Sequence, residues 1–193
     1  MVRPPRPLVF GNMKNKKYQI IYADPPWRYD FAKLKRDSIE AHYNSMDLEE
    51  IKSLKVPSAD NSVLYLWATA PKLREALDVM DAWGFKYKTH AIWDKGNALG
   101  LGYWFRGQHE LLLVGTKGKF SPPQDTERVG SILRQPKSEH SSKPSRIRNL
   151  ISEWYSNFSK LELFARKNEE SLFTPNSIPW DIWGNEVKSD IEL

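Results

Sequence analysis

Short apolar runs alternate with amphipathic stretches along most of this chain. Residues 19–23 (Gln-Ile-Ile-Tyr-Ala) form a nearly continuous apolar run rich in β-forming residues, and residues 63–67 repeat this pattern. Runs of this length that stop at proline or polar residues are typical of strands buried on both faces of a parallel sheet. Residues 89–93, 111–115 and 161–165 predict three further strands.

Two stretches between these runs carry apolar residues at helical spacing. A helix is predicted over residues 71–84, because it opens on proline, repeats apolar residues every three or four positions and meets a glycine at its end. The same spacing predicts a second helix from about residue 144 to 154, and Asp47 and Glu50 are spaced to cap a shorter one. Alternating strands and helices predict an α/β domain with a mostly parallel sheet, whose ligands bind at the carboxyl ends of strands.

The composition fits one globular domain. The chain has 193 residues, of which 40% are hydrophobic and 27% charged, so it can bury a core and is not a disordered chain. We expect a proline-rich N-terminal arm over residues 1–17 and a single domain over residues 18–193. No run approaches the roughly 18 apolar residues of a membrane span, and the start lacks the apolar segment of a signal peptide. A cytoplasmic protein without membrane contact is therefore expected.

The counts of cysteine, histidine and charged residues narrow the chemistry. Zero cysteines exclude a disulfide framework, a thiolate metal site and a cysteine nucleophile. The four histidines include no pair with metal-ligand spacing on one face, so no metal is predicted. A net charge of +5 permits a polyanionic partner without demanding one. Exposed aromatic rings beside cations bind nucleic-acid bases by stacking, so the eight tryptophans also permit such a partner. The alternative is a place in the core, which we expect for the tryptophans at apolar strand or helix positions: Trp67, Trp83, Trp93 and Trp154.

Three connections are unusually basic or rich in glycine. Residues 94–108 hold four glycines around Trp104 and Arg106, and residues 116–142 form a long basic segment. Residues 28–45 follow the first strand directly. The basic residues of this third segment are Lys33, Lys35 and Arg36. Together the three segments predict a polyanion-binding rim at one sheet edge, and the alternative is an ordinary solvated surface.

The most specific local signal is Asp24-Pro25-Pro26-Trp27, directly after the first predicted strand. Each proline fixes its own φ and restrains the residue before it, so the Asp24 carboxylate and the Pro25 carbonyl are held stiffly at the strand end. Both can accept hydrogen bonds from one exocyclic amine, and Trp27 can supply a stacking face. The nitrogen lone pair would then be aimed away, toward an electrophilic methyl group. The alternative interpretation is a simple turn, because Asp-Pro-Pro also ends ordinary strands.

Nine segments in a fixed order carry a resemblance to a known family. They are residues 23–29, 42–46, 64–69, 93–96, 102–106, 109–115, 140–144, 162–166 and 183–186. With them the chain, from about Tyr18 to Val187, resembles the MT-A70 family of N6-adenine methyltransferases, close to its compact bacterial and phage members. The resemblance implies a Rossmann-like methyltransferase that uses S-adenosylmethionine, with the catalytic tetrapeptide preceding the cofactor segments as in circularly permuted amino-methyltransferases.

The resemblance also implies roles for individual residues. The catalytic motif is Asp24, Pro25, Pro26 and Trp27, which would hold the target amine and wall the adenine pocket. Lys143 would pair with the methionine carboxylate of the cofactor. The other residues implied in cofactor binding are Asp24, Ser142, Glu162, Phe164, Arg166, Asn168, Asn185 and Glu186. Substrate contacts are expected from Tyr43, which the family places beside the pocket, and from the loop residues Trp104, Arg106, Lys33, Lys35 and Arg36.

The expected reaction is methyl transfer from S-adenosylmethionine to the N6 amine of adenine in DNA. The base must be flipped out or single-stranded, because its amine is inaccessible in a stacked duplex. Hydrogen bonds from both amine protons would favour a pyramidal nitrogen and offset the positive charge that develops on it. The same reaction on RNA is an alternative, and so is a non-catalytic nucleic-acid-binding partner subunit. The family includes homodimers and heterodimers, which leaves the oligomeric state open.

Overall fold

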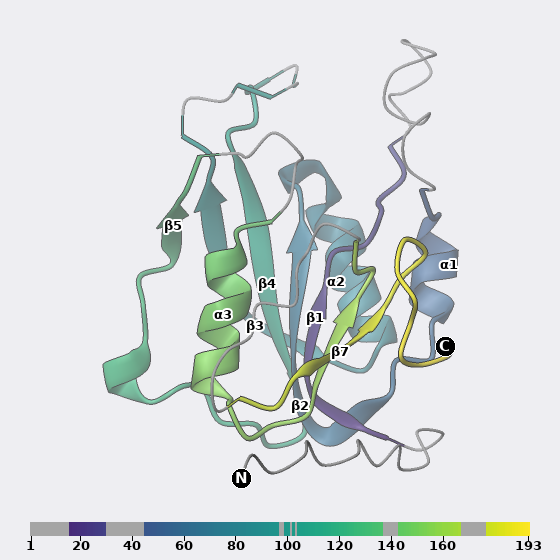
Figure 1. Ribbon diagram of the computed structural model, residues 1–193. Coiled ribbons are helices and arrows are strands. Elements are labelled where there is room, and N and C mark those ends of the chain that lie inside the picture. Colours follow the sequence, from purple (N-terminus) through teal and green to yellow (C-terminus); the bar gives the residue numbers. More distant parts are fainter. Residues whose placement is uncertain are drawn as a thin grey trace, which may run out of the picture.

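A seven-stranded mixed sheet organises the part of the chain that the structure, a computed structural model, describes: residues 16–29, 45–96, 99–100, 102, 104–136, 143–166 and 177–193 (Figure 1). The strands are β1 (Tyr18–Ala23), β2 (Ser58–Ala68), β3 (Lys86–Asp94), β4 (His109–Lys117), β5 (Ile132–Arg134), β6 (Lys160–Leu163) and β7 (Trp180–Trp183). The helices are α1 (Leu48–Ser53), α2 (Leu73–Ala82) and α3 (Ser145–Trp154), with short 3-10 helices η3 (Ala70–Lys72) and η4 (Asp125–Glu127). The strand order across the sheet is β5-β3-β4-β2-β1-β6-β7.

The strands around β1 all run in the same direction. Ala23, the last residue of β1, pairs with Leu66 of β2 and with Leu163 of β6, and β7 continues the parallel arrangement beyond β6. The carboxyl ends of these strands therefore meet at one edge of the sheet, which is where α/β proteins bind ligands. Asp24 leaves β1 at this edge. The α/β fold with a mostly parallel sheet, predicted from the sequence, is confirmed.

β4 departs from the parallel pattern. It pairs antiparallel with β2 on one side and with β3 on the other. Residues 95–108 join β3 directly to β4, and two neighbouring strands joined without a crossover must run in opposite directions. Ala68, at the end of β2, pairs with Leu111 near the start of β4. The connection from β3 to β4 therefore lies at the same edge of the sheet as Asp24.

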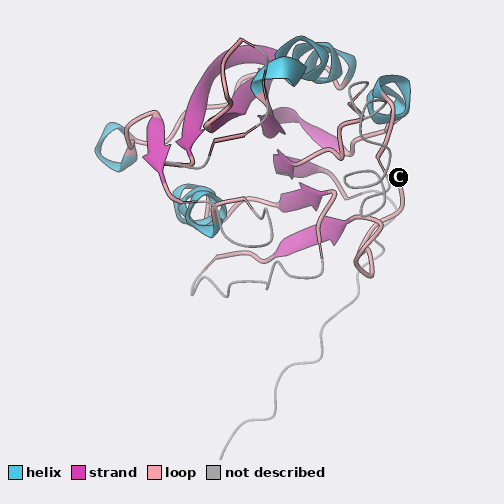
Figure 2. Ribbon diagram, turned by 90° about the horizontal axis from the view of Figure 1, so that it is seen from above, coloured by secondary structure: helices cyan, strands magenta, loops and turns pink. Residues whose placement is uncertain are grey.

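Helices cover both faces of the sheet, as the view from above shows (Figure 2). On one face, Ile20 of β1 packs in a cluster with Ile147 of α3. On the other, Ile21 packs in a cluster with Met80 of α2. Successive side chains of a strand point to opposite faces, so a strand covered on both sides must be apolar throughout. The continuous apolar run of β1 follows directly from its central position.

The predicted core tryptophans are largely inside. The side chains of Trp67, Trp83 and Trp93 are buried, and Trp154 is half-buried against the cluster under α3. Among the helices that the structure describes, none is both long and apolar enough to pass through a bilayer.

Two helix ends follow their sequence signals. Asp47 and Glu50 form a reciprocal capping box at the start of α1, as their spacing predicts. Gly84 ends α2 with φ +81°, a left-handed conformation that glycine adopts without steric cost. The N–H of Phe85 then donates to the carbonyl of Met80 at 2.9 Å, which satisfies a carbonyl in the last turn. These local contacts set where the chain turns back toward β3.

Candidate active site

The turn after β1 is closed by its own backbone. The N–H of Trp27 donates to the Pro25 carbonyl at 2.9 Å, and the N–H of Met46 donates to the Pro26 carbonyl at 3.0 Å. One of the two lone pairs of the Pro25 carbonyl is therefore engaged within the turn. The second lone pair can still accept a hydrogen bond. The motif is thus stiffened by two hydrogen bonds in addition to the prolines.

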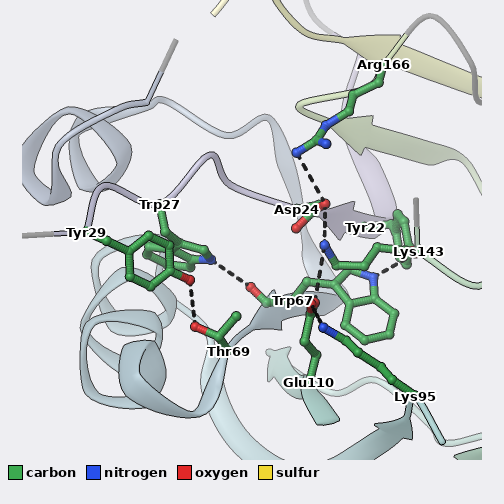
Figure 3. A network of polar contacts seen from close by, with 10 residues as sticks. All are labelled: Tyr22, Asp24, Trp27, Tyr29, Trp67, Thr69, Lys95, Glu110, Lys143 and Arg166. Atoms are coloured by element: carbon green, nitrogen blue, oxygen red, sulfur yellow. Dashed lines mark hydrogen bonds and ion pairs between the residues drawn. The ribbon is translucent and has the colours of Figure 1, made fainter. Parts of the chain in front are cut away.

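Two cations lie at the Asp24 carboxylate (Figure 3). Lys143 Nζ donates to Asp24 Oδ2 at 2.7 Å, and Arg166 Nη2 lies 3.9 Å from the same oxygen. Lys143 stands immediately before α3, and Arg166 follows β6, so residues distant in sequence converge on the end of β1. The tertiary structure therefore brings together three of the predicted site residues.

A second carboxylate supports Lys143 from the other side. Lys143 Nζ lies 3.3 Å from Glu110 Oε2, and Lys95 donates to Glu110 Oε1. Burial alone would lower the pKa of Lys143, but the carboxylates of Asp24 and Glu110 outweigh it and raise that pKa. Burial alone would raise the pKa of Glu110, but the two lysines hold it below its ordinary value. Lys143 and Glu110 are both charged at neutral pH.

Sequence reasoning missed Glu110 as a site residue. The sequence holds a signal for it, because Glu110 is a charged residue placed directly before the apolar run 111–115. In the structure Glu110 is buried in β4. Buried carboxylates are rare unless they are paired. A charged residue at the edge of a predicted buried strand, next to a strand with a lysine at its end, therefore indicates an ion pair.

Replacing Glu110 with glutamine is expected to lower the free energy of unfolding by about 2 kcal/mol at pH 7. The folded-state pKa of Glu110 lies below its unfolded value, so its contribution to stability is present above about pH 4.5 and is lost as the pH falls through the folded-state pKa. Urea unfolding at several pH values would measure this. The difference between wild type and variant should shrink below about pH 4.5, and a difference independent of pH would contradict the assignment.

Two aromatic side chains following Asp24 are anchored to the end of β2. Trp27 Nε1 donates to the Trp67 carbonyl at 3.1 Å, and the Tyr29 hydroxyl is 2.6 Å from Thr69 Oγ1. Figure 3 shows both rings to one side of the Asp24 carboxylate. Trp27 is half-buried, which suits a ring that presents one face to a ligand. Tyr29, which the sequence did not single out, belongs to the same wall.

The ends of β6 and β7 form a sharp corner beside this site. Phe164 has φ +64°, a left-handed conformation that is uncommon for a residue with a side chain. Gly184 packs so closely that a Cβ there would lie 2.5 Å from the Ala165 carbonyl oxygen. Asn185 and Glu186 follow it and are exposed. The implied cofactor residues of this segment therefore stand at the carboxyl edge of the sheet, and their contact with a cofactor stays a prediction.

Glu162 is more deeply buried than Asn185 and Glu186, which are also implied in cofactor binding. Arg148 Nε, from α3, donates to Glu162 Oε2 at 2.7 Å, and the two side chains are only 9% and 3% exposed. The Arg148 guanidinium also lies 5.1 Å from the ring centre of Trp180. The Glu162 carboxylate is thus committed to holding α3 on the sheet. Its implied contact with the cofactor stays a prediction.

The other predicted site residues divide into two groups. Trp104 and Arg106 are exposed in the β3–β4 connection and do not join the Asp24 cluster. Six lie outside the described residues: Lys33, Lys35, Arg36, Tyr43, Ser142 and Asn168. Within the described ranges, no three histidine, aspartate or glutamate side chains gather as a metal site would require.

The fold and the Asp-Pro-Pro-Trp turn at its carboxyl edge are those of an α/β methyltransferase. Family comparison agrees, since the MT-A70 family profile matches residues 18–186. The chain belongs to the MT-A70 family of N6-adenine methyltransferases.

Individual relatives differ in how much of their length is shared. The type II methyltransferase M.MunI of a Mycoplasma species is 34% identical over an alignment that covers 93% of this chain and 82% of that protein. The human N(6)-adenosine-methyltransferase catalytic subunit METTL3 is 27% identical over 182 residues, covering 89% of this chain and 28% of METTL3. An N(6)-adenosine-methyltransferase MT-A70-like protein of Arabidopsis thaliana is 29% identical over 159 residues, covering 77% of this chain and 22% of that protein. The chain thus spans less than a third of the human and plant relatives.

Proposed function

We propose that this protein transfers a methyl group from S-adenosylmethionine to the N6 amine of adenine in DNA. The observation that carries the proposal is the Asp24 carboxylate at the carboxyl end of β1, followed by the Pro25 carbonyl and flanked by Trp27. An aromatic amine is a poor nucleophile because its lone pair is delocalised into the ring. Two acceptors that take its protons favour the pyramidal nitrogen of the transition state, and the negative Asp24 offsets the charge developing there.

The charges around Asp24 fit the proposed cofactor. S-adenosylmethionine, when bound, supplies the methyl group from its sulfonium. Its carboxylate requires a cation, and Lys143 is a half-buried, charged amine at the same edge as Asp24. Arg166 and the exposed Asn185 and Glu186 would hold the ribose and adenine, because their side chains offer the donors and acceptors that hydroxyl groups and base edges need.

The choice of DNA rests on the relatives and on charge. M.MunI, which is named as a type II methyltransferase, aligns over most of both chains. The relatives named for adenosine methylation align over less than a third of their length. A net charge of +5 suits a polyanion. The Asp24 side chain is 17% exposed, so an adenine must leave the base stack to reach it.

The test is transfer of an isotopically labelled methyl group. The purified protein is incubated with labelled S-adenosylmethionine and duplex DNA, single-stranded DNA or RNA of matched sequence, and the nucleosides are separated by mass spectrometry. Label on N6-methyldeoxyadenosine is expected. Label confined to RNA would overturn the choice of substrate. Cofactor binding without transfer to any nucleic acid would instead favour a non-catalytic subunit.

Replacing Lys143 with methionine is expected to weaken binding of S-adenosylmethionine by about a hundredfold, because the cofactor carboxylate loses its charged partner. Isothermal titration calorimetry at a temperature where the variant is folded would measure this. Lys95→Met is the matched control, since it removes a cation from the Glu110 pair without touching Asp24. An equal loss in both variants would show a general electrostatic effect and contradict the assigned role.

A further inference from the structure

Two aromatic side chains stand fully exposed on the β3–β4 connection. Trp104 is 94% and Phe105 90% exposed, whereas the next most exposed large hydrophobic residue among those described, Ile132, is 58% exposed. Tryptophan is usually buried for most of its surface, and exposed apolar groups gathered at one place indicate an interaction site. We call Trp104 and Phe105 the aromatic tip. Nothing in the fold described here uses them.

The backbone below the aromatic tip is braced. Lys95 N–H donates to the Gln108 carbonyl at 2.9 Å, and Gly100 N–H donates to the Gly107 carbonyl at 2.8 Å. A Cβ on Gly102 would lie 2.0 Å from the Phe105 carbonyl oxygen, so only glycine permits so close a turn. The tip is therefore presented by a closed hairpin. A preorganised element loses little conformational freedom on binding.

The hairpin stands next to the catalytic turn. Lys95 and Glu110 lie at its two ends and are paired with each other. Glu110 contacts Lys143, which donates to Asp24, so a continuous chain of contacts joins the hairpin to the site (Figure 3). In Figure 1 the connection projects beyond the upper ends of β3 and β4. A nucleic acid that delivers a base to Asp24 would pass within reach of the tip.

One exposed cation adjoins the aromatic tip, and a second lies at the base of its hairpin. The side chain of Arg106 is exposed next to Phe105, with its Nε bonded to the Gly100 carbonyl at 3.0 Å. Arg134, at the end of β5, is also exposed and lies beside Asp94 at the end of β3. An exposed arginine next to a narrow apolar tip complements the phosphates beside a base step. A protein partner would instead need a broad patch of about 800 Å² on this surface.

We propose that the aromatic tip inserts into duplex DNA beside the target adenine and stacks on the bases left when that adenine turns toward Asp24. The inference rests on the proposed function and names its positioning element. Extruding a base loses stacking and pairing, and aromatic rings inserted in its place recover part of the stacking. The tip therefore acts only where a duplex has to be opened.

The test compares DNA substrates that differ in the free energy needed to move the target adenine out of the base stack. In the variant Trp104→Ala/Phe105→Ala, kcat/KM on duplex DNA is expected to fall by about ten- to a hundredfold. On single-stranded DNA, and on a duplex in which the target adenine faces an abasic site, it should stay within about threefold of wild type. Cofactor affinity should not change. Tyr87→Ala, which removes an exposed ring from the opposite end of β3, is the matched control and should match wild type on every substrate.

A second readout needs no methyl transfer. With 2-aminopurine at the target position, wild type should raise the fluorescence on binding duplex DNA, and the double variant should not. Equal losses on all substrates, normal 2-aminopurine fluorescence in the variant, or no DNA binding by wild type would each overturn the proposal. A change of molecular mass in light scattering between wild type and variant would overturn it too and assign the tip to contacts between copies of the chain. Base extrusion by wild type without transfer to any substrate would count against the proposed reaction alone.

Discussion

Replacing Asp24 with asparagine is expected to reduce kcat for adenine methylation by about a thousandfold, with the affinity for S-adenosylmethionine changed by only a few fold. The amide keeps the size of the side chain but loses the negative charge that offsets the developing positive charge. Its NH2 group can also point a donor at the amine. Because the neutral amide attracts Lys143 less than the carboxylate does, the cation proposed to meet the cofactor carboxylate stays available.

Single-turnover kinetics would measure the rate of methyl transfer, and calorimetry on the same preparation would measure the affinity for S-adenosylmethionine. Asp60→Asn is a suitable control, because Asp60 is an exposed aspartate in β2 whose carboxylate lies away from Lys143 and Arg166. Transfer within tenfold of wild type by the Asp24 variant would remove Asp24 from the reaction. A parallel loss of cofactor binding would instead assign Asp24 to holding the cofactor.

The largest expected effect on stability comes from Arg148. Replacing it with methionine is expected to lower the free energy of unfolding by about 3–5 kcal/mol, because Glu162 is left as an unpaired charge in the interior. The variant also loses the contact between the guanidinium and the Trp180 ring. Chemical denaturation monitored by tryptophan fluorescence would measure the change.

Two further variants separate charge from packing. In Arg148→Met/Glu162→Gln, much of the lost stability should return, because no buried charge remains. Arg146→Met changes an exposed arginine on the same helix and should stay within about 0.5 kcal/mol of wild type. A double variant as unstable as the sum of its two single variants would contradict a direct ion pair.

The elements that sequence patterns predicted best are those whose signals are local. The apolar run of β1, the capping box at Asp47 and the glycine stop of α2 all depend on neighbours a few residues away. The strands β5 and β7 have three and four residues, too short for a periodic pattern, and were not predicted. Helical spacing alone does not predict burial at a helix end. Leu73 shares a face of α2 with the buried Met80, but it lies in the first turn and is exposed.

In the site, too, local features could be predicted from the sequence and contacts between distant segments could not. The sequence alone determined the family, the Asp-Pro-Pro-Trp turn and its place after a buried strand, because these depend on residue identity and order. Only the tertiary structure decided that β4 enters antiparallel and brings Glu110 to Lys143, that Glu162 is bound by Arg148, and that Trp104 is exposed while Trp67 is buried. Each of these depends on which distant segments become neighbours, and burial and ion pairing are properties of that assembled environment rather than of any residue type.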